Sequence, residues 1–351
     1  MPLKSHIKDD SFLHVPEGVE TCKRPLTLIF FVTGNPGLIS YYHTFLSLLA
    51  RDQADTQTSD SLLLRTSQCV IAGYSLGGFE FGHDTVPEKL RVQDDKVYTL
   101  EEQIELTLAR LVGLVDDLRD DYGDGLSVNV ILIGHSLGTY ITLELIRLSH
   151  LQRVRIQVGY HITAAILLAP TIMDLAHSPS GKLAVPLLRH APFLPGFLQR
   201  VVKGLFWVVG ENGVKWLVAR MTGMSGQALE STTRFLGTNK GVKQALGMAV
   251  EELRDISTDK WGEEVWGVAS EGIGTGGTAA PDLYFFFASK DHWVADVTRE
   301  EILRTRGKGR EGRMVVDEPE GLVHAWCLYQ SEMVAQRVKG WVEEIMARNK
   351  T

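Results

Sequence analysis

Features that mark several protein classes are scarce in this 351-residue chain. It holds only three cysteines, Cys22, Cys69 and Cys327, which are too few and too widely spaced to predict a disulfide framework or a Cys-x-x-Cys metal site. Sparse cysteine favours a reducing, intracellular compartment. No run of about 18 uncharged apolar residues occurs, so we expect no membrane-spanning helix. The polar segment 1–16 lacks the apolar stretch of a signal peptide.

Basic residues are also in the minority, at 36 against 43 acidic ones, which gives a net charge of −7. A surface that follows nucleic-acid phosphates needs an excess of basic residues, so we expect no nucleic-acid partner. Hydrophobic residues make up 44% of the chain and charged residues 23%, as in ordinary folded proteins. The chain is therefore long and apolar enough to bury a large core.

Short apolar runs alternate with helical patterns along most of the chain. We predict strands at residues 26–32, 69–72, 128–133, 164–169, 282–288 and 313–316. We predict helices at residues 39–50, 99–122, 138–148 and 329–346. Thr99 and Glu102 carry the signature of a capping box at the start of the second helix. Strands that alternate with helices predict one α/β domain over residues 1–351, with a mostly parallel sheet covered on both faces.

The alternation stops between the fourth and fifth predicted strands. Residues from about 171 to 280 are apolar and partly helical, so we predict a helical lid or cap inserted into the domain. Its last part, Gly272–Thr278, is rich in glycine. No strand precedes this stretch and no Gly-Lys-Ser/Thr follows it, so we interpret it as a flexible linker and not as a phosphate-binding loop.

A Gly-x-Ser-x-Gly motif at residues 134–138 (Gly-His-Ser-Leu-Gly) lies between a predicted strand and a predicted helix. The α/β-hydrolase fold holds its nucleophilic serine on such a tight turn, where small flanking residues avoid clashes. We therefore predict Ser136 as the nucleophile and the backbone N–H of Leu137 as a donor to the oxyanion. His135 is then a candidate for the pocket. The alternative is an ordinary Gly-Ser turn at the end of a strand.

A second Gly-x-Ser-x-Gly motif occupies residues 73–77 (Gly-Tyr-Ser-Leu-Gly) and also follows a predicted strand. The residues after it include Gly78, Gly82 and Pro87, which do not favour a helix. We therefore interpret Ser75 as part of a loop that could line the pocket, and not as the nucleophile.

An acid and a histidine follow Ser136 in the order that α/β-hydrolases share. Asp291 comes just after the strand at 282–288, where a carboxylate can orient an imidazole. Asp296 is the main rival, and Asp282 lies at the wrong end of that strand. His324 lies between the last predicted strand and the last helix, so we predict it as the general base. The alternatives are a solvated aspartate and a structural histidine.

The segment Gly34–Gly37 (Gly-Asn-Pro-Gly) follows the first strong strand, where these hydrolases place a second backbone donor for the oxyanion. Pro36 has no N–H, so Asn35 or a following residue would donate, with Gly34 as a pocket candidate. The alternative is a plain turn. The remaining histidines show no paired metal spacing, and serine chemistry of this kind needs no cofactor, so we expect neither a metal nor a cofactor.

Together these motifs resemble the lipid droplet-associated hydrolase family over most of the chain. The resemblance rests on Gly34–Gly37 and the aromatic residues after it (Tyr41, Tyr42 and Phe45), on Leu100–Ile104, on residues 134–138, and on Asp291–Val294 and His324–Ala325. One departure is residues 73–78, where the family usually carries a Ser-His-Ala-Gly-His-like string. The resemblance implies a serine hydrolase of lipid esters, either sterol esters or acylglycerols. It also implies a location at lipid droplets or the endoplasmic reticulum.

Residues 183–209 give a separate indication of lipid contact. The segment is long and apolar, and it is interrupted by Pro186, Pro192, Pro195, Arg189, Arg200 and Lys203. These interruptions do not suit a spanning helix, whereas a kinked hairpin or an interfacial helix on a droplet or membrane surface would fit. The alternative is an ordinary lid packed on the core. For the function, the alternatives are a soluble carboxylesterase or thioesterase and a weakly catalytic droplet-binding protein.

Overall fold

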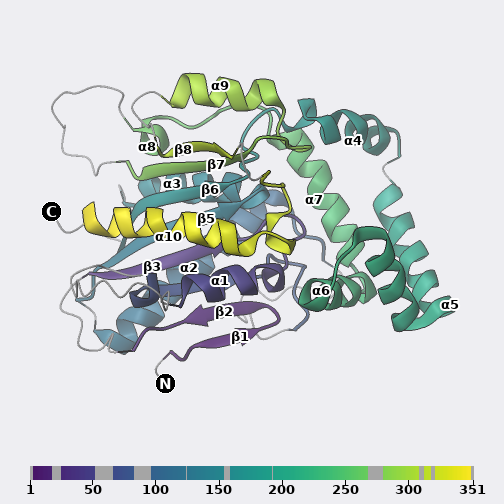
Figure 1. Cartoon of the computed structure of the whole chain (residues 1–351), viewed down its shortest axis with the longest axis horizontal. Coiled ribbons are helices and arrows are strands. Elements are labelled where there is room, and N and C mark those ends of the chain that lie inside the picture. The colour runs from purple at the N-terminus through teal and green to yellow at the C-terminus, as the bar shows by residue number, and fades with distance from the viewer. Residues whose placement is uncertain are drawn as a thin grey trace.

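An eight-stranded, mostly parallel sheet forms the centre of the molecule (Figure 1). The computed structural model describes residues 3–17, 25–51, 66–82, 96–123, 125–153, 159–191, 193–267, 280–307, 312–317 and 321–348. The strands are β1 (His6–Lys8), β2 (Ser11–His14), β3 (Leu26–Val32), β4 (Val70–Tyr74), β5 (Val128–His135), β6 (Tyr160–Leu168), β7 (Asp282–Ala288) and β8 (Met314–Asp317). Their order in the sheet is β1-β2-β4-β3-β5-β6-β7-β8, and neighbours from β4 onward pair in parallel. The predicted α/β architecture is confirmed.

The six predicted strands are all present, and the bounds of β3 and β7 are those predicted. Their nearly continuous burial explains why apolar runs predict them. The sequence patterns do not predict the hairpin of β1 and β2, because strands of three and four residues are too short to show a period. β2 pairs antiparallel with β4, so this hairpin extends the sheet at one edge.

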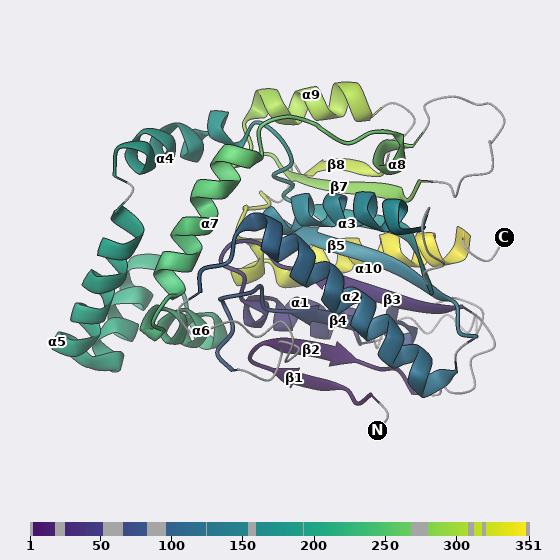
Figure 2. The same cartoon turned by 180° about the vertical axis from the view of Figure 1, so that it is seen from behind.

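Helices cover both faces of the sheet. They are α1 (His43–Leu49) after the 3-10 turn η2 (Ile39–Tyr42), α2 (Leu100–Tyr122), α3 (Leu137–Arg153), α9 (Asp296–Arg306) and α10 (Ser331–Arg348). α1 and α10 lie in front of the sheet in Figure 1, and α2 and α3 lie in front of it in Figure 2. Each face of the sheet is covered by its own core of buried apolar side chains. Successive residues of β3 point to opposite faces, so Leu28 packs in one core and Ile29 in the other.

The strength of the local sequence signals explains why α2 is predicted from the sequence and α9 is not. The capping box at the start of α2 is confirmed, because the side chain of Thr99 accepts the N–H of Glu102 and the side chain of Glu102 accepts the N–H of Thr99. The patterns do not predict α9. This helix is strongly polar and buries only Thr298 and Ile302, so it lacks an apolar stripe that could reveal it.

The chain between β6 and β7 leaves the sheet and forms a separate group of helices, the helical insertion (residues 171–280). Its elements are the 3-10 turn η5 (Leu175–His177), α4 (Pro179–His190), α5 (Leu194–Thr222), α6 (Gly226–Gly237), α7 (Gly241–Asp255) and α8 (Glu263–Trp266). α4 to α7 lie beyond one end of the strands, on the right of Figure 1, whereas α8 lies against α3. The stretch Gly272–Thr278 lies outside the described residues. No helix in the described ranges is long and apolar enough to cross a bilayer.

Candidate active site

The parallel strands bring the predicted site residues to one edge of the sheet. The loop after β3 carries Asn35, the turn after β5 carries Ser136, and the loops after β7 and β8 carry Asp291 and His324. Loops at the carboxyl ends of parallel strands open on the same side. That side faces the helical insertion (Figure 2).

Ser136 lies on a tight turn between β5 and α3. Its backbone φ is 51°, a left-handed conformation that is uncommon for residues other than glycine. A Cβ on Gly134 would lie 2.4 Å from the carbonyl oxygen of Gly138, and a Cβ on Gly138 would lie 2.3 Å from that of Val32. Glycine is therefore required at both positions, and α3 begins at Leu137 directly after the serine.

The side chains of Ser136, His324 and Asp291 form one hydrogen-bonded chain. Nε2 of His324 lies 2.8 Å from Oγ of Ser136, and Nδ1 of His324 lies 2.8 Å from Oδ2 of Asp291. A carboxylate only accepts hydrogen bonds, so Nδ1 carries the proton and Nε2 is free to accept the proton of the serine. In this arrangement a histidine can act as the base for a serine nucleophile.

Asp291 is held firmly in this chain. Its side chain is 2% exposed, and Oδ1 accepts the backbone N–H groups of Trp293 at 2.7 Å and Val294 at 3.3 Å. Burial raises the pKa of Asp291, but the hydrogen bond and charge interaction with His324 and the two N–H groups outweigh it and leave the pKa below its ordinary value. A carboxylate that stays ionised can stabilise a charged imidazole.

The rival aspartates lie in other surroundings. Asp296 opens α9 and pairs with Arg299 at 3.0 Å, and Asp282 opens β7 and pairs with Arg313 at 2.5 Å. Within the described ranges, neither forms a hydrogen bond with His324. The geometry therefore brings Asp291, and not its rivals, to the histidine.

His135 connects the serine turn to the loop that carries His324. Its Nε2 donates to the carbonyl oxygen of His324 at 2.8 Å, and its Nδ1 accepts from the hydroxyl of Tyr42 at 2.7 Å. That hydroxyl also accepts the N–H of Gly34 at 3.2 Å. Burial, helped by the nearby His324, lowers the pKa of His135 to about 3, so the ring stays neutral. The sequence patterns did not predict this contact of Tyr42, although the aromatic pair after Gly34–Gly37 is a signal for it.

Backbone N–H groups at two places lie next to Ser136. Leu137 is the first residue of α3, so its N–H has no acceptor within the helix. The loop after β3 approaches closely, because a Cβ on Gly34 would lie 3.1 Å from the Cβ of Ser136. Asn35 follows Gly34 and lines the same cavity as the serine. Leu137, Gly34 and Asn35 are thus brought together around Ser136.

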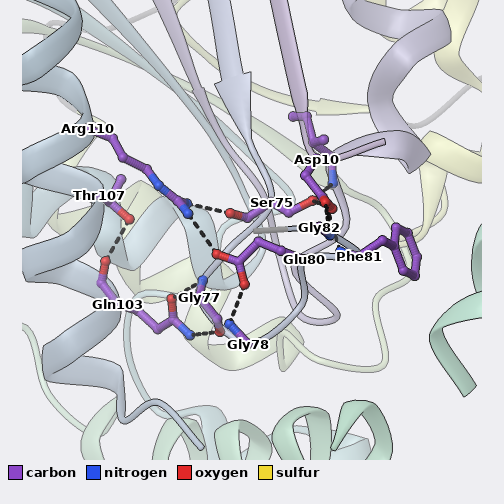
Figure 3. Close-up of polar contacts among 11 residues, drawn as sticks. Asp10, Ser75, Gly77, Gly78, Glu80, Phe81, Gly82, Gln103, Thr107 and Arg110 are labelled. Carbon is purple, nitrogen blue, oxygen red and sulfur yellow. Dashed lines mark hydrogen bonds and ion pairs between the residues drawn. The ribbon is translucent and has the colours of Figure 1, made fainter. Parts of the chain in front are cut away.

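The structure does not bring Ser75 to this site, and the interpretation of Ser75 as a pocket residue is corrected. Its side chain is fully buried, and its Oγ accepts the N–H of Ile39 at 3.2 Å and donates to Oδ1 of Asp10 at 3.3 Å. Figure 3 shows Ser75 in a polar network with Arg110 and Glu80. Asp10 comes from the turn of the β1–β2 hairpin, which the sequence patterns did not predict.

A cavity of about 490 Å³ opens beside Ser136 and His324. This volume lies in the usual range for small-molecule sites. Much of its apolar wall comes from the helical insertion, with Leu175, Met224, Phe235, Leu236, Leu246 and Ala249. The insertion also contributes Glu252, a buried carboxyl that no sequence signal identified. The described part of the chain has no group of three or more His, Cys, Asp or Glu side chains that could hold a metal ion.

The parallel sheet, the serine turn after β5 and the insertion after β6 together define an α/β-hydrolase. A solved structure, the peroxisomal alpha-beta-hydrolase Lpx1 from Saccharomyces cerevisiae, is similar in fold, with a TM-score of 0.55 and 13% sequence identity. The similarity covers 95% of this chain and 81% of that chain.

The chain belongs to the lipid-droplet associated hydrolase family, which it matches over residues 25–327. The lipid droplet-associated hydrolase of Gallus gallus is 27% identical over 342 residues, which cover 94% of this chain and 88% of the relative. That of Dictyostelium discoideum is 24% identical over 328 residues, which cover 92% and 89%. The resemblance seen in the sequence motifs is confirmed, and the protein is a hydrolase.

Proposed function

We propose that this hydrolase is a serine esterase that cleaves lipid esters, either sterol esters or acylglycerols, at the surface of lipid droplets. The observation that carries the proposal is the hydrogen-bonded chain of Ser136, His324 and Asp291 beside a cavity with an apolar wall. The names of the related proteins support a location at lipid droplets. A location at the endoplasmic reticulum stays a prediction.

The proposed reaction has two steps. Oγ of Ser136 attacks the ester carbonyl carbon while Nε2 of His324 takes its proton, and the N–H groups of Leu137 and Asn35 stabilise the oxyanion. His324 then gives the proton to the leaving alcohol, which leaves an acyl group on Ser136. Water, deprotonated by His324, attacks this acyl-enzyme and releases the fatty acid, and Ser136 regains its proton. Asp291 orients the imidazole throughout.

The surface of α4 and α5 supports contact with a lipid surface. Large apolar side chains are exposed there, among them Trp207 (88% exposed), Met221 (84%) and Leu183 (78%). Arg200 is exposed on the same helix α5 as Trp207 and can contact phospholipid head groups, whereas Lys203 donates to the carbonyl oxygen of Gly237 and to Asn239. Soluble monomeric proteins rarely expose large groups of apolar side chains, which often mark an interaction site.

Labelling with a fluorophosphonate probe tests the nucleophile. The wild-type protein and the Ser75→Ala variant are expected to be labelled, and the Ser136→Ala variant is not. Loss of labelling in Ser75→Ala alone would show that the other serine turn is the reactive one. A wild-type protein that folds but resists the probe would favour a droplet-binding protein with little catalysis.

Hydrolysis assays with two kinds of ester test the substrate. A lipid esterase should prefer emulsified long-chain cholesteryl or glyceryl esters to a soluble short-chain ester. The double variant Trp207→Ser/Met221→Ser should lose this preference and no longer float with artificial triacylglycerol droplets. Val297→Ser on α9, which removes an apolar side chain that is 71% exposed outside the insertion, serves as the control. A preference for soluble esters or thioesters in the wild type would favour the soluble carboxylesterase or thioesterase.

A further inference from the structure

Helix α7 of the insertion holds the loop beside the nucleophile by its side chain. Nδ2 of Asn35 donates to the carbonyl oxygen of Ala245 at 3.0 Å and to Oε1 of Glu252 at 2.7 Å. Both acceptors lie on α7. Asn35 follows Gly34, which packs against Ser136, so these two hydrogen bonds tie the insertion directly to the site.

Glu252 is a carboxyl group for which the reaction outlined above has no role. The residue is 7% exposed and lines the cavity, and its hydrogen bond in the described structure is to Asn35. Burial raises the pKa of Glu252 to about 8, although the hydrogen bond from Asn35 lowers it. The group is therefore mostly a neutral carboxylic acid at pH 7.

Besides His324, the titratable groups that line the cavity with Glu252 are held neutral by burial. Burial raises the pKa of Tyr41 and that of Cys327 to about 12 and lowers that of His135 to about 3, so these cavity residues stay uncharged near neutral pH. On α7 itself, Glu251 accepts the N–H of Leu100, and Arg254 pairs with Asp255. On the helices that pack against α7, Arg110 of α2 is buried and pairs with Glu80 at 2.8 Å. Other charged side chains described on these helices are wholly or partly exposed, and include Glu105, Lys182, Arg200, Lys203, Glu230 and Arg234.

We propose that Glu252 is a positioning residue, which acts through the side chain of Asn35 to hold the loop Gly34–Gly37, with its proposed oxyanion donor, in place for the reaction at Ser136. The proposal rests on the proposed esterase function. Fixed donors stabilise an oxyanion only if their geometry is set before the reaction, and α7 sets it here through two hydrogen bonds. A neutral acid can do this without placing a negative charge near the oxyanion, whereas an ionised one would oppose it.

The test compares Glu252→Gln, Glu252→Ala and the control Glu251→Gln. Each is assayed from pH 6.5 to pH 9.5 with a soluble p-nitrophenyl ester, so that binding to lipid surfaces does not enter. Glutamine keeps an acceptor for Asn35 and cannot ionise. We expect kcat of the wild type to fall as the pH rises through about 8, and kcat of Glu252→Gln to stay within a few-fold of the maximum without that fall. Glu251→Gln should behave as the wild type.

For Glu252→Ala we expect kcat to fall about 10-fold to 100-fold with little change in KM, because a displaced oxyanion donor affects the transition state. Wild-type kinetics in Glu252→Ala, or the same alkaline fall in Glu252→Gln as in the wild type, would overturn the proposal. If Glu252→Ala does not fold, the comparison of the pH profiles of Glu252→Gln and the wild type still tests the positioning role. Fluorophosphonate labelling of the wild type and Ser136→Ala reports separately on the esterase itself, so a failure of that function is distinguished from a failure of the positioning role.

Discussion

Two turns of this chain share the motif Gly-x-Ser-x-Gly, yet their serines have different surroundings. The hydroxyl of Ser136 lies 2.8 Å from the imidazole of His324 and beside a cavity. The hydroxyl of Ser75 is fully buried and is bonded to the N–H of Ile39 and the carboxyl of Asp10. A serine becomes a nucleophile when a base can reach it, so the motif alone does not define the site.

The residues after each serine differ in the same way. Leu137 begins α3, and its N–H has no acceptor within the helix. The corresponding N–H of Leu76 donates to the carbonyl oxygen of Gly37 at 2.8 Å, and that of Gly77 donates to Gln103 at 2.8 Å. The backbone donors after Ser75 are already used, and this turn has no free place for an oxyanion.

Replacing each serine with alanine tests the difference between the two turns most directly. Ser136→Ala should lower ester hydrolysis by about 10,000-fold or more, because the acyl-enzyme cannot form. Ser75→Ala should keep kcat within a few-fold, but lower the free energy of unfolding by about 1–3 kcal/mol, because the N–H of Ile39 loses its buried acceptor. Initial rates and urea unfolding measure the two effects. Equal loss of activity in both variants would remove the distinction between the turns.

The acid can be separated from its rival in the same assay. Asp291→Asn should lower kcat by about 10,000-fold, because an amide no longer fixes the proton on Nδ1 of His324. Asp296 has a side chain that is 70% exposed where it pairs with Arg299, so Asp296→Asn should change kcat less than two-fold. A larger effect at Asp296 than at Asp291 would reassign the acid.

The network around Ser75 should matter for stability and not for catalysis. Arg110 and Glu80 form a buried ion pair at 2.8 Å, with side chains 4% and 9% exposed (Figure 3). Arg110→Met leaves the Glu80 carboxylate buried without its partner, so we expect the free energy of unfolding to fall by about 3–5 kcal/mol. The activity of the molecules that remain folded should not change. The double variant Arg110→Met/Glu80→Gln should recover part of the loss, and a double variant as unstable as the single one would contradict this account.

The sequence predicts the Ser136 turn better than the Ser75 network for a physical reason. The strand, the two glycines and the helix around Ser136 are neighbours in the chain, so local patterns reveal them. The order serine, acid, histidine that α/β-hydrolases share along the chain predicts Asp291 and His324. The parallel sheet brings both to Ser136, because its strands end at the same edge. The partners of Ser75 come from the short β1–β2 hairpin, where Asp10 lies, and from α2, and no local pattern links these segments.

Glu252 and Tyr42 show the same limit within the site. Glu252 lies 217 residues after Asn35 in the chain, and it meets Asn35 only because the helical insertion folds over the sheet edge. From the sequence, a buried glutamate in an amphipathic helix such as α7 cannot be distinguished from a solvent-exposed one. Tyr42 and His135 are 93 residues apart in the chain, and the hydroxyl of Tyr42 reaches His135 only because η2 packs against the end of β5.

His135 precedes Ser136 and Tyr74 precedes Ser75. Replacing these two residues tests the difference between the turns with the smallest expected effect. The pKa of His135 is lowered to about 3 mainly by burial, whereas burial raises the pKa of Tyr74, so Tyr74 does not titrate between pH 5 and pH 7.5. As the pH falls below the ordinary histidine value of about 6.5, the unfolded chain binds a proton at His135 that the folded chain does not bind. The stability that comes from His135 is therefore complete above about pH 6.5 and is lost as the pH falls, by about 2 kcal/mol at pH 5.

The variants His135→Gln and Tyr74→Phe measure this difference between the turns. Glutamine can keep the donor to the carbonyl oxygen of His324 but has no proton to gain, so the unfolding free energy of His135→Gln should fall by about 2 kcal/mol less than that of the wild type between pH 7.5 and pH 5. Tyr74→Phe should follow the wild type over this range. Urea unfolding at both pH values gives the result. If the wild type and His135→Gln lose stability in parallel, His135 is protonated in the folded protein, and its neutral link between Tyr42 and the loop of His324 is not the state in which the enzyme works.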